Sequence, residues 1–299
     1  MPARRNHGEE TRPRIRDGRP RGRGPIGGAL RISRPNARFQ QWEALLRSRN
    51  KRQRAGEFLV QGVRPITMAV ERGWPVRALI HDADRPLSRW AVGILASARG
   101  ERVAMAPELL RELSGKDEEV PELLAVLELP PDELSRIPVA PSFLGVVFDR
   151  PTSPGNIGTI VRSVDAFGGA GLVVTGHAAD PYDPKAVRAS TGSLMAVPVV
   201  RVPSHREVLE WVERERAAGR PLTIVGTDEN GAADIADVDL TGPTLLVIGN
   251  ETAGLSAGWR QSCDTIARIP IGGAASSLNA ATAATVALYE ATRQRGGPP

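Results

Sequence analysis

The C-terminal half of the chain alternates short apolar runs with amphipathic segments. Six runs rich in Val, Ile and Leu recur there: FLGVVFD, GLVVTG, AVPVVRV, PLTIVGTD, TLLVIG and TIARIPI. Short runs that are apolar at nearly every position are typical of strands buried on both faces, and such strands occur in parallel sheets covered by helices. Residues 138–299 are therefore predicted to form an α/β domain built on a mainly parallel sheet.

Strands and helices also alternate in the preceding segment, residues 34–137. Strand patterns such as EFLVQG and VRALIH are interleaved with helix patterns such as FQQWEALL and RPITMAVERG, which predicts a smaller α/β domain. The stretch PPDELSRIPVAP separates the two domains, because proline interrupts helices and strands alike. Residues 1–33 are rich in Gly, Pro and Arg and are predicted to be a disordered basic arm.

Positive charge is concentrated towards the N-terminus. The net charge is +5, yet residues 1–34 hold ten Arg against three acids, and the run RSRNKRQR at 47–54 adds five cations. The rest of the chain is net negative, and such local charge is typical of proteins that bind nucleic acid. An arm that only aids solubility is the alternative. The predicted RNA contacts are Arg47, Arg49, Lys51, Arg52 and Arg54.

Composition also limits how the chain can bind and react. With five Trp, five Phe and two Tyr, a base-stacking platform is disfavoured, and phosphate contact with shape recognition is expected instead. One cysteine and four scattered histidines indicate neither disulfides nor a metal site. The sequence contains no signal peptide or apolar run of about 18 residues, so we expect a cytoplasmic protein without membrane association.

Polar residues and glycines follow three of the predicted strands. They lie in RPTSPGNIGTIVR, in NETAGL and in GGAASSLNAAT, each at the strand end where ligands bind in open α/β sheets. Taken singly, each segment could serve only as a turn or a capped helix start. Together they form a site of backbone groups and neutral hydrogen bonders, which suits an adenosyl-type cofactor and methyl transfer to an oriented hydroxyl.

These segments resemble the three motifs of the SpoU-type SPOUT methyltransferases. NIGTIVR, LLVIGNETAGL and IPIGGAASSLNAATA match them in order, and KAVRASTGSLMAVPV is also similar to that family. The segment NARFQQWEALLRSRNKRQRAGEFLVQG resembles the family's ribosomal-protein-like RNA-binding domain, although Gln61 replaces its common glutamate. Within the family, the chain is most similar to the avilamycin-resistance-type enzymes, which modify large-subunit ribosomal RNA.

The resemblance implies a function and a set of site residues. It implies 2′-O-ribose methylation of RNA with S-adenosyl-L-methionine (AdoMet), a trefoil knot, a homodimer formed through the catalytic domain, and resistance to a ribosome-targeting antibiotic. The implied catalytic residues are Asn156, Arg162, Glu251, Ser277 and Asn279. The implied cofactor-binding residues, which act largely through their main chains, are Thr227, Gly249, Gly254, Ile269 and Leu278.

The chemistry of the guanidinium group limits the catalytic role that Arg162 can have. A guanidinium stays protonated at neutral pH and is therefore a poor base. We therefore expect Arg162 to hold the phosphate beside the target ribose and orient the hydroxyl, rather than remove its proton.

Three alternatives remain open from the sequence. A non-catalytic RNA-binding protein would explain the basic segments but not three polar strand ends in this order. Transfer RNA is a second substrate candidate, although a separate N-terminal docking domain favours the larger ribosomal RNA. A nicotinamide-dependent oxidoreductase is disfavoured, because the folded region lacks a dinucleotide fingerprint.

Overall fold

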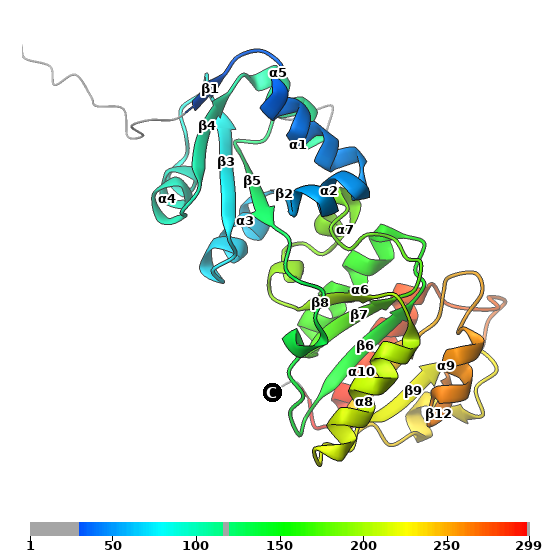
Figure 1. Ribbon diagram of the computed structural model, residues 1–299. Coiled ribbons are helices and arrows are strands. Elements are labelled where there is room, and N and C mark those ends of the chain that lie inside the picture. Colours follow the sequence, from blue (N-terminus) through cyan, green and yellow to red (C-terminus); the bar gives the residue numbers. More distant parts are fainter. Residues whose placement is uncertain (1–29, 116–119, 298–299) are drawn as a thin grey trace, which may run out of the picture.

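The computed structural model describes residues 30–115 and 120–297, which form two α/β domains joined through an extended segment (Figure 1). In the N-terminal domain five strands form a sheet in the order β1-β4-β3-β5-β2. They are β1 (Leu30–Ile32), β2 (Glu57–Gln61), β3 (Val76–Asp82), β4 (Glu101–Met105) and β5 (Leu123–Glu128). The helices are α1 (Ala37–Arg47), α2 (Arg49–Ala55), α3 (Val63–Glu71), α4 (Arg89–Ser97) and α5 (Pro107–Ser114).

The start of this domain corrects the predicted arm boundary. Residues 30–32, assigned to the arm from their composition, form β1 and pair in parallel with β4. Ile32 is buried in the core beside Phe39 and Trp42. Burial of this one apolar side chain against a sheet edge outweighs the Gly- and Arg-rich neighbourhood. The rest of the predicted arm, residues 1–29, lies outside the described residues.

The C-terminal domain has a seven-stranded, entirely parallel sheet in the order β10-β12-β9-β11-β6-β7-β8. The strands are β6 (Leu144–Asp149), β7 (Gly171–Thr175), β8 (Val199–Val202), β9 (Thr223–Thr227), β10 (Ala233–Asp234), β11 (Thr244–Ile248) and β12 (Thr265–Arg268). The helices are α6 (Pro154–Ala166), α7 (Pro184–Ala189), α8 (His205–Ala217), α9 (Ala257–Ser262) and α10 (Ala280–Gln294), with 3₁₀ turns η1 (Leu134–Arg136), η2 (Ser193–Met195) and η3 (Ile235–Asp237). The predicted fold class is confirmed, whereas the knot stays a prediction.

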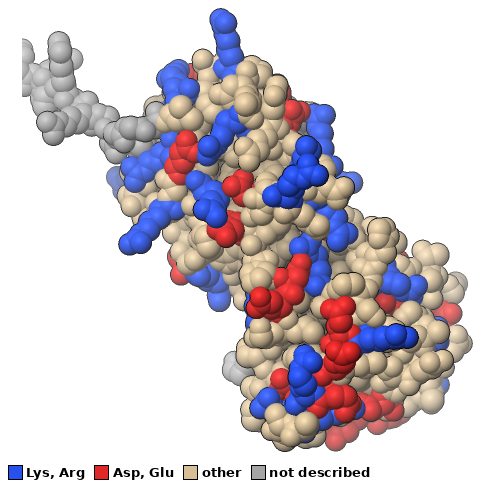
Figure 2. All heavy atoms as spheres, viewed as in Figure 1, with Lys and Arg blue, Asp and Glu red and all other residues tan. Residues whose placement is uncertain are grey.

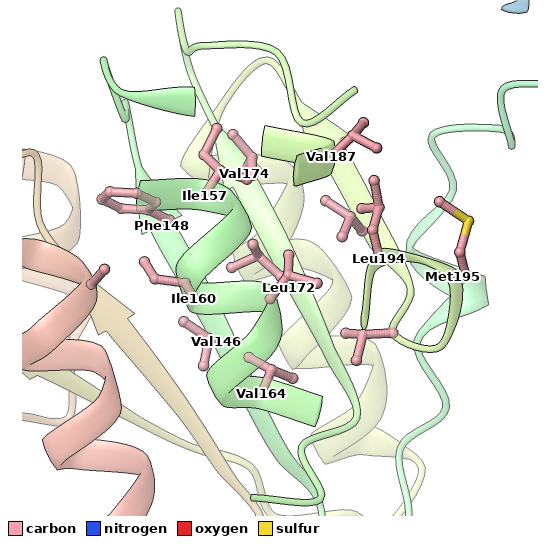
Figure 3. Packing of buried hydrophobic residues seen from close by; sticks show 14 of the residues in the cluster. Val146, Phe148, Ile157, Ile160, Val164, Leu172, Val174, Val187, Leu194 and Met195 are labelled. Carbon is pink, nitrogen blue, oxygen red and sulfur yellow. The ribbon is translucent and has the colours of Figure 1, made fainter. Parts of the chain in front are cut away.

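Both faces of this sheet are covered, as the continuous apolar strands predicted. Alternate strand residues pack on α6, α7 and α10 on one face, where Ile157 and Ile160 contact Val146 and Phe148 (Figure 3). The opposite face packs on α8 and α9 through Trp211 and other apolar side chains. A strand whose side chains all find apolar partners has no polar face. No helix in the described ranges is long and apolar enough to span a bilayer.

Strand order decides where polar residues can meet. β11 lies between β6 and β9, and β12 pairs with β9 on the far side. Because these strands are parallel, their carboxyl ends share one edge of the sheet, which is where open α/β folds bind ligands. The segments 150–153, 249–255 and 269–279 leave this edge together, although up to about 120 residues separate them in sequence.

Candidate active site

The carboxylate of Glu251 ties the loop after β11 to the start of α6. Its Oε2 accepts hydrogen bonds from the backbone N–H (3.0 Å) and hydroxyl (3.0 Å) of Thr152, and its Oε1 accepts from the Ser153 N–H (3.2 Å). Burial would raise the pKa of Glu251, but these bonds outweigh that effect and lower it below the usual 4.5. Glu251 is therefore an anionic anchor for the N-terminus of α6.

Two asparagines extend this anchor into a chain of side-chain contacts. Asn156 Nδ2 donates to Glu251 Oε1 (3.0 Å), and Asn279 Nδ2 donates to Asn156 Oδ1 (3.2 Å). Asn279 also caps α10, because its Oδ1 accepts from the N–H groups of Ala281 (2.9 Å) and Thr282 (3.4 Å). Each amide orientation is thus set by its partners, and residues from all three predicted motifs meet at one point.

A tight turn after β11 brings backbone groups together beside this network. Asn250 and Gly254 exchange two backbone hydrogen bonds of 3.0 Å, and Gly254 adopts φ +64. A Cβ on Gly249 would lie 2.5 Å from backbone atoms of Gly254 and Leu255. Glycine at 249 is required because only hydrogen fits between these two backbone segments.

A cavity of about 240 Å³ opens beside the turn. Two of the predicted catalytic residues, Glu251 and Ser277, line it. All five predicted cofactor-binding residues line it as well, namely Thr227, Gly249, Gly254, Ile269 and Leu278. Ile248 and Ile271 extend the apolar wall, and Asp228 and Glu229 lie on its rim. The cofactor-binding residues predicted from separate sequence motifs therefore line one cavity.

The lining of this cavity fits AdoMet. Exposed backbone and aliphatic side chains at 248–254 and 269–278 suit an adenosyl group, and the acidic rim suits a cationic sulfonium. One rim carboxylate, Asp228, is already paired with Arg260 at 2.7 Å, which leaves Glu229 as the exposed acid. Among the described residues, no three His, Cys, Asp or Glu side chains gather as metal ligands.

Arg162 and Ser277 stand apart from the hydrogen-bonded network. Ser277 lies at the cavity wall and is exposed. Arg162 lies on the solvent face of α6, two turns beyond Asn156, and is neither part of the cavity wall nor bonded to the network residues that the structure describes. An exposed guanidinium on the helix that carries Asn156 can contact a bound phosphate.

The basic run 47–54 spans the end of α1 and most of α2, and its cations divide into an exposed group and a buried or half-buried group. Lys51 and Arg54 are exposed and line a groove between α1 and α2, and Arg47 is exposed but paired with Glu43 at 2.8 Å. Arg49 is half-buried and donates to the Ala178 carbonyl (2.6 Å).

The prediction that Arg52 contacts RNA is wrong. Its side chain is only 2% exposed and pairs with Asp180 at 2.7 Å. One turn of helix contains cations on opposite faces, and only tertiary packing shows which face is covered.

Sequence reasoning missed the backbone donors of the site. Thr152 and Ser153 hold Glu251, and Ser153 also caps α6 by accepting from the Asn156 N–H (3.3 Å). The available signal was the Thr-Ser-Pro-Gly order, in which serine precedes a proline at the first helical position. Asn250 was also missed as a structural residue: its Nδ2 donates to the Arg150 carbonyl (2.6 Å).

Comparisons with known proteins agree with this geometry. Residues 144–289 match the SpoU rRNA Methylase family, and residues 36–125 match the SpoU L30e-like domain. A 23S rRNA (uridine(2479)-2′-O)-methyltransferase from Streptomyces viridochromogenes is 64% identical over 89% of this chain and 93% of that protein. An uncharacterized tRNA/rRNA methyltransferase from Mycobacterium tuberculosis (strain ATCC 25618 / H37Rv) is 32% identical over 93% of this chain and 86% of that protein.

Solved structures give the same result. The SpoU methyltransferase AviRb from S. viridochromogenes, in complex with AdoMet, superposes with a TM-score of 0.85 at 64% identity, over 89% of this chain and all of that one. An AdoMet-bound rRNA methyltransferase from Sinorhizobium meliloti superposes with a TM-score of 0.79 at 28% identity, over 89% and 98% of the two chains. The fold, the site and these relatives together show that the chain belongs to the SpoU rRNA methylase family.

Proposed function

We propose that this protein methylates a ribose 2′-hydroxyl of 23S ribosomal RNA with AdoMet as donor. The observation that carries the proposal is the Glu251–Asn156–Asn279 network, whose Glu251 lines a cavity that fits AdoMet. When bound, AdoMet supplies a methyl group on a sulfonium, which is already activated for transfer. The chain itself then has to bind, orient and exclude water.

Positioning is what the residues of the site can provide. Among the described residues that line the cavity there is no histidine, cysteine or lysine. Of its carboxylates, Glu251 accepts four hydrogen bonds and Asp228 is paired with Arg260, so both serve structure rather than proton removal. Asn156 and Asn279 present amide groups of fixed orientation to an incoming ribose. Arg162, exposed two turns beyond Asn156 on α6, holds the adjacent phosphate and so places the hydroxyl.

The role of Arg162 can be tested with a conservative substitution. If it binds phosphate as a cation, Arg162→Lys keeps measurable activity with a raised KM, and Arg162→Met loses it. Loss of all activity in the lysine variant, with RNA binding intact, would contradict the assigned role. Steady-state methyl transfer and RNA binding, measured on the same preparations, separate these results.

Ribosomal RNA is proposed over transfer RNA for two reasons. The N-terminal domain matches a SpoU L30e-like domain, and the Streptomyces relative of similar length is named for 23S rRNA. On the face shown in Figure 2, Lys and Arg side chains outnumber the acidic ones over the N-terminal domain, whereas Asp and Glu are more frequent on the catalytic domain, where Lys and Arg also occur. A basic docking domain beside an acidic catalytic domain suits a large polyanion that is bound at one end of the molecule.

The substrate test compares RNAs directly. Purified protein is incubated with radiolabelled AdoMet and either 23S rRNA transcript or total transfer RNA, and the modified ribose is mapped by primer extension at low nucleotide concentration. Methylation of one ribose in 23S rRNA supports the proposal, and methylation of transfer RNA alone refutes it. Expression in an avilamycin-sensitive strain tests resistance, because the proposal predicts a raised inhibitory concentration. A ribosomal substrate also places the enzyme in the cytoplasm.

A homodimer is proposed from the exposed side of α10. Tyr289 is 56% exposed on this helix, and its ring centroid lies 6.2 Å from that of Phe167, the residue that follows α6. An exposed aromatic beside a second apolar ring is typical of a protein interface. Tyr289→Asp should shift the mass measured by light scattering from dimer to monomer, and an unchanged mass would count against this surface as the interface.

A further inference from the structure

Helix α2 has two cationic faces with different surroundings. Lys51 and Arg54 are exposed and line the groove between α1 and α2. Arg49 and Arg52 point instead at the catalytic domain. The helix that we propose as an RNA contact is therefore also the helix that joins the two domains.

Arg52 forms the buried centre of this junction. Its Nε donates to Asp180 Oδ2 (2.7 Å), its Nη1 donates to the Leu45 carbonyl (2.6 Å), and its Nη2 lies 3.4 Å from Asp183 Oδ2. Arg52 is 2% exposed and Asp180 is 5% exposed. The planar guanidinium thus fixes three directions at once, which a lysine ammonium on a flexible stem does not do.

The partner segment of Arg52 leads directly to the active site. Ala178 accepts the hydrogen bond from Arg49, and Ala179 N–H donates to the Pro151 carbonyl (2.7 Å). Thr152, which follows Pro151, donates hydrogen bonds from its N–H and its hydroxyl to the Glu251 carboxylate. An unbroken series of bonds therefore links α2 to the carboxylate that anchors Asn156.

Packing around this series leaves the domains little freedom. Phe58 of β2 contacts the ring of Tyr182 at 4.9 Å, and the Trp74 indole donates to the Met195 carbonyl (3.0 Å). One apolar cluster runs from the N-terminal domain into the catalytic domain without interruption. Apolar contact alone would hold the domains together, but it does not set a unique angle between them.

A buried ion pair is a poor source of stability and a better source of specificity. Desolvation of both charges offsets most of their attraction, and apolar replacements of similar volume are often as stable. Directional bonds, in contrast, are satisfied in one arrangement only. The Arg52–Asp180 pair is therefore best explained by what it positions.

We propose that Arg52 is a positioning residue that holds the RNA-docking helix at one distance and angle from the active site, so that a single ribose of the docked RNA reaches Asn156. This inference rests on the proposed function. Successive nucleotides of a stacked strand are on the order of 3 Å apart. A displacement of α2 by a few ångströms is enough to bring a neighbouring ribose to the site or to leave none in place.

Two variants separate positioning from folding. Arg52→Met with Asp180→Asn removes both charges and keeps an acceptor for the Tyr182 N–H, which Asp180 Oδ1 accepts at 3.1 Å, so we expect the melting temperature to stay close to that of the wild type. Arg52→Lys keeps the charge and loses the three-way geometry. The matched control is Arg77→Met, which removes an exposed ion pair with Glu128 (2.7 Å) inside the N-terminal domain.

The assay uses the full chain, AdoMet and 23S rRNA transcript. AdoMet affinity by calorimetry, RNA affinity, kcat, KM and the methylated position are measured for each protein. We expect both Arg52 variants to bind AdoMet and RNA within about threefold of the wild type, to show kcat about 10- to 100-fold lower, and to methylate riboses beside the normal one. The Arg77 control should match the wild type in AdoMet affinity, kcat and methylated position.

Different results refute different claims. If the wild type methylates no RNA, the proposed function fails. If the wild type methylates one ribose, and the folded Arg52 variants methylate that same ribose at an unchanged kcat, the positioning role of Arg52 fails alone. If the double variant does not fold, the Arg52→Lys protein tests the positioning role. A purely structural role predicts that this protein has a lower melting temperature but methylates the same ribose as the wild type.

Discussion

Replacement of Glu251 by glutamine tests the central contact of the site. The carboxylate accepts four hydrogen bonds, two from Thr152 and one each from Ser153 and Asn156. Glutamine keeps one acceptor oxygen and turns an NH₂ group towards donors, so at least one backbone N–H bond is lost, and a second is kept only if the Thr152 hydroxyl or the Asn156 amide turns to accept. A hydrogen bond to a charged group is worth about 1.5–3 kcal/mol when buried. Because the Thr152 bonds are solvent-exposed, we take about 2 kcal/mol for the whole change.

This loss should appear in stability and in catalysis. About 2 kcal/mol corresponds to a melting temperature lower by about 4–8 °C. The amide of Asn156 loses its fixed partner, and a displacement of about 1 Å lowers the rate about 100-fold. We therefore expect kcat for methyl transfer to 23S rRNA to fall by about 10- to 100-fold. Radiolabelled AdoMet measures the transfer, and calorimetry measures AdoMet affinity.

The control is Glu210→Gln, an exposed glutamate on α8 away from the site, which should change neither quantity. An E251Q protein with wild-type kcat would refute the reasoning, since the hydrogen-bonded anchor would then contribute nothing to the reaction. A lower melting temperature with an unchanged kcat would leave Glu251 a structural role only.

Other substitutions test the remaining parts of the site. Gly249→Ala places a Cβ 2.5 Å from the backbone of the neighbouring turn, so AdoMet binding should weaken by about 1–3 kcal/mol in calorimetry, whereas Gly242→Ala, with nothing within 4 Å, should bind normally. Asn279→Ala and Asn36→Ala each remove a helix cap and should each lower the free energy of unfolding by about 1 kcal/mol, but only the first should lower kcat. Because the pKa of Glu251 is below its usual 4.5, its contribution is complete above about pH 4.5 and is lost as the pH falls through the folded value. The difference in melting temperature between the wild type and E251Q should therefore close in acid, and a constant difference would contradict the assignment.

The features read correctly from the sequence share a local cause. Continuous apolar runs can be satisfied only as strands buried on both faces, so 138–299 was recognisable as a covered parallel sheet. Polar residues and glycines directly after such strands have few structural explanations, and the motifs around Asn156, Glu251 and Asn279 identified the family and its cofactor. The comparisons confirm these inferences.

Tertiary structure alone decided which neighbours each side chain has. Composition assigned Leu30–Ile32 to the arm, but pairing with β4 makes it a strand. Arg52 and Arg54 are both arginines of one basic run, yet one is buried against Asp180 and the other lines an open groove. Charge and periodicity are properties of the chain itself, whereas burial and partners depend on segments that approach from more than a hundred residues away. For this reason the sequence identified the chemistry of the site, and the fold determined which cations remain free to meet RNA.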